Sequence, residues 1–205
     1  MLKVGLTGGY ATGKTLVAGE LERLGCRVIL ADELGHTVLE PEGEAYAATV
    51  NAFGRGILGP DGLVDRKKLG EIVFGSPELL KLLSGLVHPA VIRLEEQILE
   101  RFRAEDPRAI AVVEAAILIE TGRDAVFDRI ILTVCDEETQ IRRGMKRDHL
   151  SREQVIARLE KQSPLQEKKA RAHYLIDTSG PKEETIQQVR NVHRDLKSLA
   201  EGQHL

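Results

Sequence analysis

The sequence predicts an α/β domain whose parallel sheet is covered by helices on both faces. Two continuous apolar runs, "AIAVVEA" (109–115) and "RIILTVC" (129–135), are typical of strands that are buried on both sides. Helical stretches separate the expected strands, which indicates parallel βαβ units rather than a sandwich or a barrel. A glycine-rich segment between the first strand and the first helix is the third observation, because doubly wound sheets bind ligands at such turns.

The other elements follow from hydrophobic periodicity. Apolar residues alternate over the first strand, and the helices carry apolar residues at a spacing of three and four. These elements are expected: a strand over 2–6, a helix over 14–25 that stops at Gly25, a strand over 26–30, a strand over 174–178 and a helix over 182–199.

The stretch between the second and third strands is too long for a simple crossover. It spans roughly seventy residues with a mostly helical pattern, where crossover connections are usually much shorter. It includes the turn "LGPDGLVDR" (58–66) and a His88-Pro89 step inside an apolar periodic stretch. We therefore expect one domain over 1–205 that contains a helical subdomain over 41–104.

Composition and charge exclude several classes of protein. The net charge is −3, aromatic residues make up 3% and Trp is absent, which argues against a base-stacking surface for nucleic acid. The longest apolar run is broken by Glu114, and the N-terminus has no cleavable signal pattern. Cys26 and Cys135 both lie in apolar surroundings, so we expect two buried thiols. These features predict a cytoplasmic protein without membrane or nucleic-acid partners.

The segment "GLTGGYATGKT" (5–15) carries the clearest functional signal. Gly8-x-x-x-x-Gly13-Lys14-Thr15 stands between an expected strand and an expected helix, as a phosphate-binding loop requires. Its amides and the helix N-terminus would cradle an ATP or GTP triphosphate, with Lys14 on the β- and γ-phosphates and the Thr15 hydroxyl on Mg²⁺. The alternative is a glycine-rich turn without a ligand. The expected nucleotide-binding residues of this loop are Gly8, Ala11, Thr12, Gly13, Lys14, Thr15 and Leu16.

Asp32 follows the second strand and has three possible roles. The segment "DELG" (32–35) fits a GTPase switch, but the sequence has no Asn-Lys-x-Asp element to read guanine and the segment comes too early. At the carboxyl end of a strand, Asp32 is placed to take a hydroxyl proton, to help hold Mg²⁺, or both. As the third possibility, it caps the following helix.

A basic segment over 138–165 indicates a lid. Arg143 and Arg147 are four residues apart with Lys146 beside them, and like charges at this spacing repel one another. Such a row is useful if a polyphosphate enters, because arginines neutralise charge on the transferred phosphoryl group. The alternative is a solvated basic face.

The ordered motifs resemble the dephospho-CoA kinase family from about residue 3 to residue 180. The resemblance rests on "GLTGGYATGKT", "VILADELGH", "GPDGLVDRKKLGEIVF" followed by "HP", "VVEAAILIETG", "QIRRGMKRD" and "AHYLIDTSG". It implies a P-loop kinase fold with a five-stranded core, a helical insertion on the acceptor side and a mobile lid. It also implies Mg²⁺-dependent transfer of the γ-phosphoryl of ATP to the 3′-hydroxyl of dephospho-CoA, the last step of coenzyme A synthesis.

The resemblance assigns roles to individual residues. Asp32 becomes the general base and a Mg²⁺ ligand, Lys14 the phosphate clamp, and Arg143 and Arg147 the lid arginines over ATP. Backbone groups near Gly180 would hold adenine. Five further residues are expected on the acceptor side: His36, Asp65, Arg66, His88 and Glu114.

Each acceptor-side residue has a plainer alternative. Glu114 lies in an apolar run, where a carboxylate is costly unless it contacts the acceptor, a Mg²⁺-bound water or a nearby Arg. His36 can be a surface residue, Asp65 an ordinary helix cap beside Arg66, and His88 a packing residue next to Pro89.

The sequence departs from the family pattern at four positions. Leu30 replaces the first Asp of Asp-Ala-Asp, Ala116 replaces Pro, His173 replaces Asp, and Thr178 replaces Asn near the adenine. Two other functions remain open: another small-molecule or nucleoside monophosphate kinase of this fold, or a nucleotide-binding regulator without turnover. The chain is expected to be a monomer or a small homo-oligomer.

Overall fold

The computed structural model describes residues 1–160 and 162–202. They divide into two compact units that are described separately below. The first comprises Met1–Ile29 and Phe102–Leu205, and the second comprises Leu30–Arg101. The second unit is thus inserted into the first along the chain.

The first unit is built on the predicted parallel sheet. Its five strands follow the order β2-β3-β1-β4-β5, so the first strand of the chain is central. The strands are β1 Leu2–Gly8, β2 Arg27–Leu30, β3 Ile110–Glu114, β4 Arg129–Val134 and β5 Tyr174–Asp177. β1 pairs in parallel with β3 and β4, and β4 pairs in parallel with β5. The fold class and all five strand positions are confirmed.

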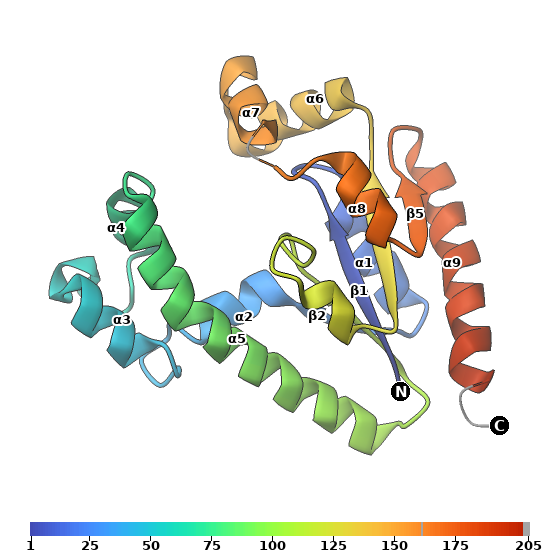
Figure 1. Ribbon diagram of the computed structural model, residues 1–205, viewed down its shortest axis with the longest axis horizontal. Helices are drawn as coiled ribbons and strands as arrows, with labels where there is room; N and C mark the ends of the chain where they lie inside the picture. Colours follow the sequence, from blue (N-terminus) through green and yellow to red (C-terminus); the bar gives the residue numbers. More distant parts are fainter. Residues whose placement is uncertain (161, 203–205) are drawn as a thin grey trace. The chain divides into compact units, whose positions relative to one another are not determined.

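Helices cover this sheet on both faces (Figure 1). On one face, α1 (Lys14–Arg23) and α9 (Lys182–Gly202) pack together and contact β1 and β3. On the other, α8 (Leu165–Arg171) packs on β4, and Gly5 of β1 lies under Leu118 and Phe127. The short helix η2 (Arg123–Val126) is joined to α8 by an ion pair between Asp124 and Arg171 at 3.0 Å. Both predicted terminal helices are present, and α9 extends slightly beyond its expected end.

Two capped helices follow β4 in the region expected to be a lid. α6 (Glu137–Asp148) begins after Asp136, whose side chain accepts a hydrogen bond from the Thr139 amide. α7 (Arg152–Leu159) begins with a capping box between Ser151 and Gln154. Such caps satisfy amides that the first helical turn leaves unpaired. Residue 161, within the expected lid range 138–165, lies outside the described residues.

The second unit is helical. It contains α2 (Ala31–Thr37), α3 (Tyr46–Phe53), η1 (Arg55–Ile57), α4 (Arg66–Val73) and most of α5 (Pro77–Glu105). Two apolar clusters hold it together. The first is centred on Val38, Ala45 and Ala90, and the second on Ile57, Leu69 and Val73. In the predicted turn over 58–66, Gly62 has φ +79°, a conformation that L side chains rarely adopt.

The thiols differ in their surroundings. Cys26 is buried, and burial raises its pKa to about 12. Cys135 is half-buried after β4, so the expectation of two buried thiols is correct for Cys26 and wrong for Cys135. Across the described residues, none of the helices has both the length and the apolar character needed to cross a membrane.

Candidate functional site

Residues 8–15, here called the phosphate loop, join β1 to α1 and have the backbone of an anion cradle. Gly13 has φ +80° and Ala11 has φ +56°, so the chain turns through left-handed conformations twice before the helix begins. Alternation of this kind turns successive amides toward one point. At Gly8, an added Cβ would lie 2.1 Å from the Thr133 hydroxyl, so only glycine fits there.

The two signature side chains of the loop stand at its helix end. The Lys14 ammonium donates to the carbonyl oxygens of Gly8 and Gly9, each at 3.1 Å, and so lies across the loop. Thr15, in the first turn of α1, is exposed. The N-cap residue is Gly13, so no side chain caps the N-terminus of α1, the end of a helix that attracts anions.

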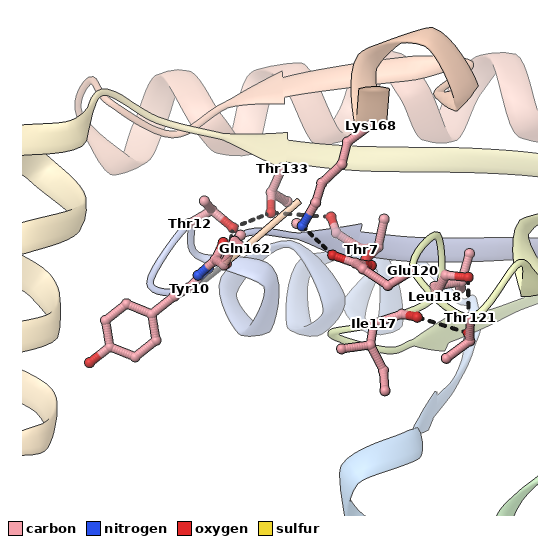
Figure 2. A network of polar contacts seen from close by, with 12 residues as sticks. Thr7, Tyr10, Thr12, Ile117, Leu118, Glu120, Thr121, Thr133, Gln162 and Lys168 are labelled. Carbon is pink, nitrogen blue, oxygen red and sulfur yellow. Dashed lines mark hydrogen bonds and ion pairs between the residues drawn. The ribbon is translucent and has the colours of Figure 1, made fainter. Parts of the chain in front are cut away.

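Two threonines from outside the phosphate loop contact Thr12: Thr133 of β4 (Figure 2) and Thr178, just after β5. The hydroxyls of Thr12 and Thr133 lie 2.7 Å apart, and both residues are buried. The Thr178 hydroxyl, just after β5, donates to the Thr12 carbonyl at 3.0 Å. The departure to threonine at 178 therefore supplies a loop contact. No pattern local to residues 8–15 predicts these partners, because they come from more than a hundred residues away.

A cleft of about 510 Å³ opens beside the loop, among Gly9, Thr133, Gln140 and Gln162. Lys168 of α8 also lines it. Its side chain is only 4% exposed, and its ammonium lies 2.6 Å from a Glu120 carboxylate oxygen (Figure 2). The cleft lies next to the cradle and has both polar and apolar lining residues, so it extends the surface available to a nucleotide.

Both predicted lid arginines lie close to the phosphate loop within the first unit. Arg143 donates to the hydroxyl and the carbonyl of Thr178, at 2.9 and 2.6 Å. Arg147 donates to both carboxylate oxygens of Asp148, at 2.7 and 3.1 Å. Its guanidinium carbon is 4.8 Å from the ring centroid of Tyr10, a residue of the loop.

Sequence reasoning missed Tyr10, Gln140 and Gln162 as site residues. The Tyr10 amide donates to the Gln162 side-chain oxygen at 3.1 Å, and the Gln140 side-chain amide donates to the Tyr10 carbonyl at 2.9 Å. An aromatic side chain among glycines is itself a signal, because the loop's own chemistry requires no ring. The two glutamines give no comparable signal in the sequence.

Asp32 lies in the second unit, exposed in the first turn of α2. Leu30 occupies the N-cap position of this helix and no side chain caps it, so the interpretation of Asp32 as an N-cap is wrong. Asp32 is the second residue of α2, which directly follows the carboxyl end of β2.

Four other residues expected on the acceptor side belong to the same unit. Arg66 Nη1 lies 3.3 Å from His36 Nδ1, so these side chains meet although they are 30 residues apart. Asp65 caps α4 by accepting from the amides of Lys67 and Lys68, as an ordinary N-cap does. His88 is exposed on α5 and therefore does not pack at a kink.

Two remaining candidates flank the sheet in the first unit. Glu114 is half-buried at the end of β3, where it pairs in register with Leu6 of β1. Gly180 is exposed after β5, next to Ser179, whose hydroxyl accepts a hydrogen bond from the Asp136 amide. Of the departures, His173 has a structural role, because its Nδ1 accepts from the Ile130 amide of β4.

The donor set suits a cation held mainly by a substrate. Within 1–160 and 162–202, no group of three or more His, Cys, Asp or Glu is placed to hold a metal ion. Mg²⁺ in phosphoryl-transfer sites usually takes one or two protein ligands and completes its shell with phosphate oxygens and water. The exposed Thr15 hydroxyl fits that role.

Comparison with known proteins agrees with this geometry. The sequence pattern of a family described as dephospho-CoA kinase matches residues 2–184. A dephospho-CoA kinase from Geobacter sulfurreducens is 43% identical over 189 residues, which is 92% of this chain and 95% of that protein. A dephospho-CoA kinase domain-containing protein from Danio rerio is 40% identical over 96% of this chain and 86% of its own length.

Solved structures show the same fold. A crystal structure from Thermus thermophilus superposes with a TM-score of 0.81 at 32% identity, covering 95% of this chain and 97% of that one. A dephospho-CoA kinase from Campylobacter jejuni has a TM-score of 0.64 at 27% identity, covering 95% and 96% of the two chains.

Proposed function

The chain belongs to the dephospho-CoA kinase family and is an ATP-dependent kinase of that family. From this premise we propose how its residues move the γ-phosphoryl group of ATP onto the 3′-hydroxyl of dephospho-CoA. The observation that carries the proposal is a phosphate loop of the correct backbone geometry within a chain that matches the family over residues 2–184.

The phosphate loop binds and orients the triphosphate. Its amides and the N-terminus of α1 present partial positive charge to the phosphates. When ATP binds, the Lys14 ammonium would leave the carbonyl oxygens of Gly8 and Gly9 and bind the β- and γ-phosphates instead. Thr15, together with Asp32, would hold Mg²⁺, which neutralises phosphate charge when bound. Catalysis of this kind consists mainly of positioning and electrostatic stabilisation.

Asp32 is the proposed general base. Its exposure, its place after the end of β2 and its freedom from capping support this role. It would accept the proton of the 3′-hydroxyl as the oxygen attacks the γ-phosphorus in line with the leaving oxygen of ADP. His36, Asp65, Arg66, His88 and Glu114 are proposed to contact the acceptor.

The basic lid completes the proposed site. Arg143 and Arg147 would neutralise the charge that spreads over the transferred phosphoryl group, and backbone near Gly180 would hold adenine. Their present partners, Thr178 and Asp148, keep both guanidinium groups close to the phosphate loop. The region 138–165 closes over ATP in this proposal, while 41–104 carries the acceptor. The enzyme is proposed to work in the cytoplasm as a monomer or a small homo-oligomer.

The activity itself is tested by incubating the protein with Mg-ATP and dephospho-CoA and measuring the molecular mass of the product by mass spectrometry. We expect an acceptor product heavier by one phosphate. Turnover of a different alcohol instead would indicate another kinase of this fold, and nucleotide binding without any turnover would indicate a regulator.

Two substitutions separate the proposed roles. Asp32→Asn should bind ATP nearly normally while losing most of kcat, because only proton acceptance and a Mg²⁺ contact are removed. Lys14→Ala should weaken both nucleotide binding and rate. An Asp32→Asn enzyme with the wild-type rate would refute the general-base assignment.

A further inference from the structure

The side chain of Tyr10 leaves the phosphate loop and enters the helices that follow β4. In Figure 2 its ring points away from Thr12 and Thr133. The hydroxyl donates to Asp148 Oδ2 at 2.5 Å. The ring lies so close to α6 that a Cβ on Gly144 would stand 2.5 Å from the Tyr10 Cε1 atom. Glycine at 144 therefore makes room for this ring.

Two arginines surround the same ring. Arg147 lies 4.8 Å and Arg158 of α7 lies 5.7 Å from its centroid, both within cation–π range. Asp148 joins all three side chains, because it accepts from Tyr10, from Arg147 and, at 3.0 Å, from Arg158. Hydrogen bonds from Arg147 and Tyr10 lower the pKa of Asp148 to about 2, so this carboxylate is charged at neutral pH.

The backbone of Tyr10 is fixed to the same region. Gln140 of α6 holds its carbonyl, and Gln162, beyond α7, holds its amide. Residue 10 is therefore tied to α6 and to the segment after α7 through backbone and side chain together. An aliphatic residue at position 10 would keep the backbone contacts, but it would lose the hydroxyl for Asp148 and the π face for Arg147.

We propose that Tyr10 is a positioning residue for phosphoryl transfer, which holds α6 and α7 against the phosphate loop and orients Arg147 toward the γ-phosphoryl group. The inference rests on the proposed role of Arg147. Tyr10 itself does not touch the reacting atoms. The Tyr10 ring fixes the plane of the Arg147 guanidinium. Asp148 holds two N–H groups of that guanidinium until phosphate oxygens replace the carboxylate.

Steady-state kinetics of Tyr10→Leu test the proposal. We expect kcat to fall about tenfold, with the KM for ATP changed less than about twofold, because an arginine that is poorly oriented costs transition-state stabilisation and leaves loop binding intact. Tyr10→Phe keeps the ring and should lose less. The matched control is Tyr174→Phe, which removes a hydroxyl from β5 in the same unit and should have the wild-type kcat.

A double-mutant cycle of Tyr10→Leu and Arg147→Ala distinguishes positioning of Arg147 from a general structural effect. In the Arg147→Ala background, Tyr10→Leu should change kcat less than about twofold, because the guanidinium that Tyr10 orients is absent. An equal loss in both backgrounds, or a raised KM with unchanged kcat, overturns the proposal. If Tyr10→Leu does not fold, Tyr10→Phe and Gly144→Ala, which displaces the ring, take its place in the cycle. A wild-type rate for Arg147→Ala alone would instead refute the lid assignment of the proposed function.

Discussion

The side chain of Lys168 is almost completely withdrawn from water, and its ammonium forms an ion pair with the Glu120 carboxylate. A charge in such a place requires a counter-charge, since removing one member of a buried pair leaves the other uncompensated. The pair joins α8 to the segment that follows β3 (Figure 2). It therefore connects two parts of the layer that covers β1 and β4.

Glu120→Gln should lower the free energy of unfolding by about 3 kcal/mol, near the lower limit for a broken buried pair because Glu120 keeps 24% of its side-chain exposure. Urea unfolding at pH 7 measures this. Adding Lys168→Met should recover most of the loss, because the double variant buries no unpaired charge. If the double variant is as unstable as Glu120→Gln, the pair is not the cause.

At the scale of single residues, the roles that could be predicted from the sequence are those that depend only on neighbouring residues in the chain. Lys14 and Gly13 occupy their expected places because the motif sets the loop's own geometry. Thr178 and Tyr10 were not assigned, since their roles depend on partners brought together by the fold. Burial of Glu114 and Lys168 likewise depends on tertiary packing.

At the scale of elements, α6 and α7 pack together and are joined by two ion pairs. Arg158 of α7 pairs with Asp148 at the end of α6, and Arg152 pairs with Glu138 near its start. These exposed pairs are individually weak, but they act beside the capping box that starts α7.

The Asp148 cluster makes the stability of this helix pair depend on pH. Since the pKa of Asp148 falls from 3.8 to about 2 on folding, its contribution is present above pH 4 and is lost as the pH falls toward 2. Asp148→Asn should cost about 1 kcal/mol at pH 6, a value reduced by solvent screening, and roughly half as much at pH 3, where the folded-state carboxylate is still largely ionised. Urea unfolding at both pH values measures the difference.

Asp195→Asn, on an exposed part of α9, controls for the loss of one negative charge. It should change the free energy of unfolding little at either pH. A cost of Asp148→Asn that does not shrink at pH 3 would contradict the assignment of the cluster.

Helix α5 contains the His88-Pro89 step that the sequence placed inside an apolar periodic stretch. The helix runs from Pro77 to Glu105 with Pro89 inside it. Both residues are exposed, so the ring of the proline meets solvent rather than a packed neighbour. Continuous apolar contacts of Val87, Ala90, Val91 and Leu94 with the first cluster hold the helix together on its other side.

At the scale of the whole molecule, the two compact units predict separate responses to the two substrates. Mg-ATP alone should slow amide hydrogen exchange in residues 8–17 and 137–159, and dephospho-CoA alone should slow it in residues 55–73. The reason is that the phosphate loop belongs to one unit, whereas Asp65 and Arg66 belong to the other. Mass-resolved exchange measures both.

The Lys14→Ala variant serves as the control, because its response to nucleotide should be lost while its response to dephospho-CoA is kept. Unchanged exchange in 55–73 on addition of dephospho-CoA would contradict the acceptor assignment of that segment.

The sheet was predictable from the sequence because its strands are continuous apolar runs of the correct length. The helical region was predictable only as a class. Its compact boundaries, 30 and 101, differ from the expected 41 and 104, because amphipathic helices do not mark where contacts change from one unit to the other.

The helical unit enters the chain between β2 and β3, which are neighbours in the sheet. An insertion placed there can be lengthened, shortened or exchanged without changing the register of any strand. With the acceptor bound by this unit, as proposed, natural variation or engineering could alter the choice of alcohol while leaving the phosphate loop unchanged.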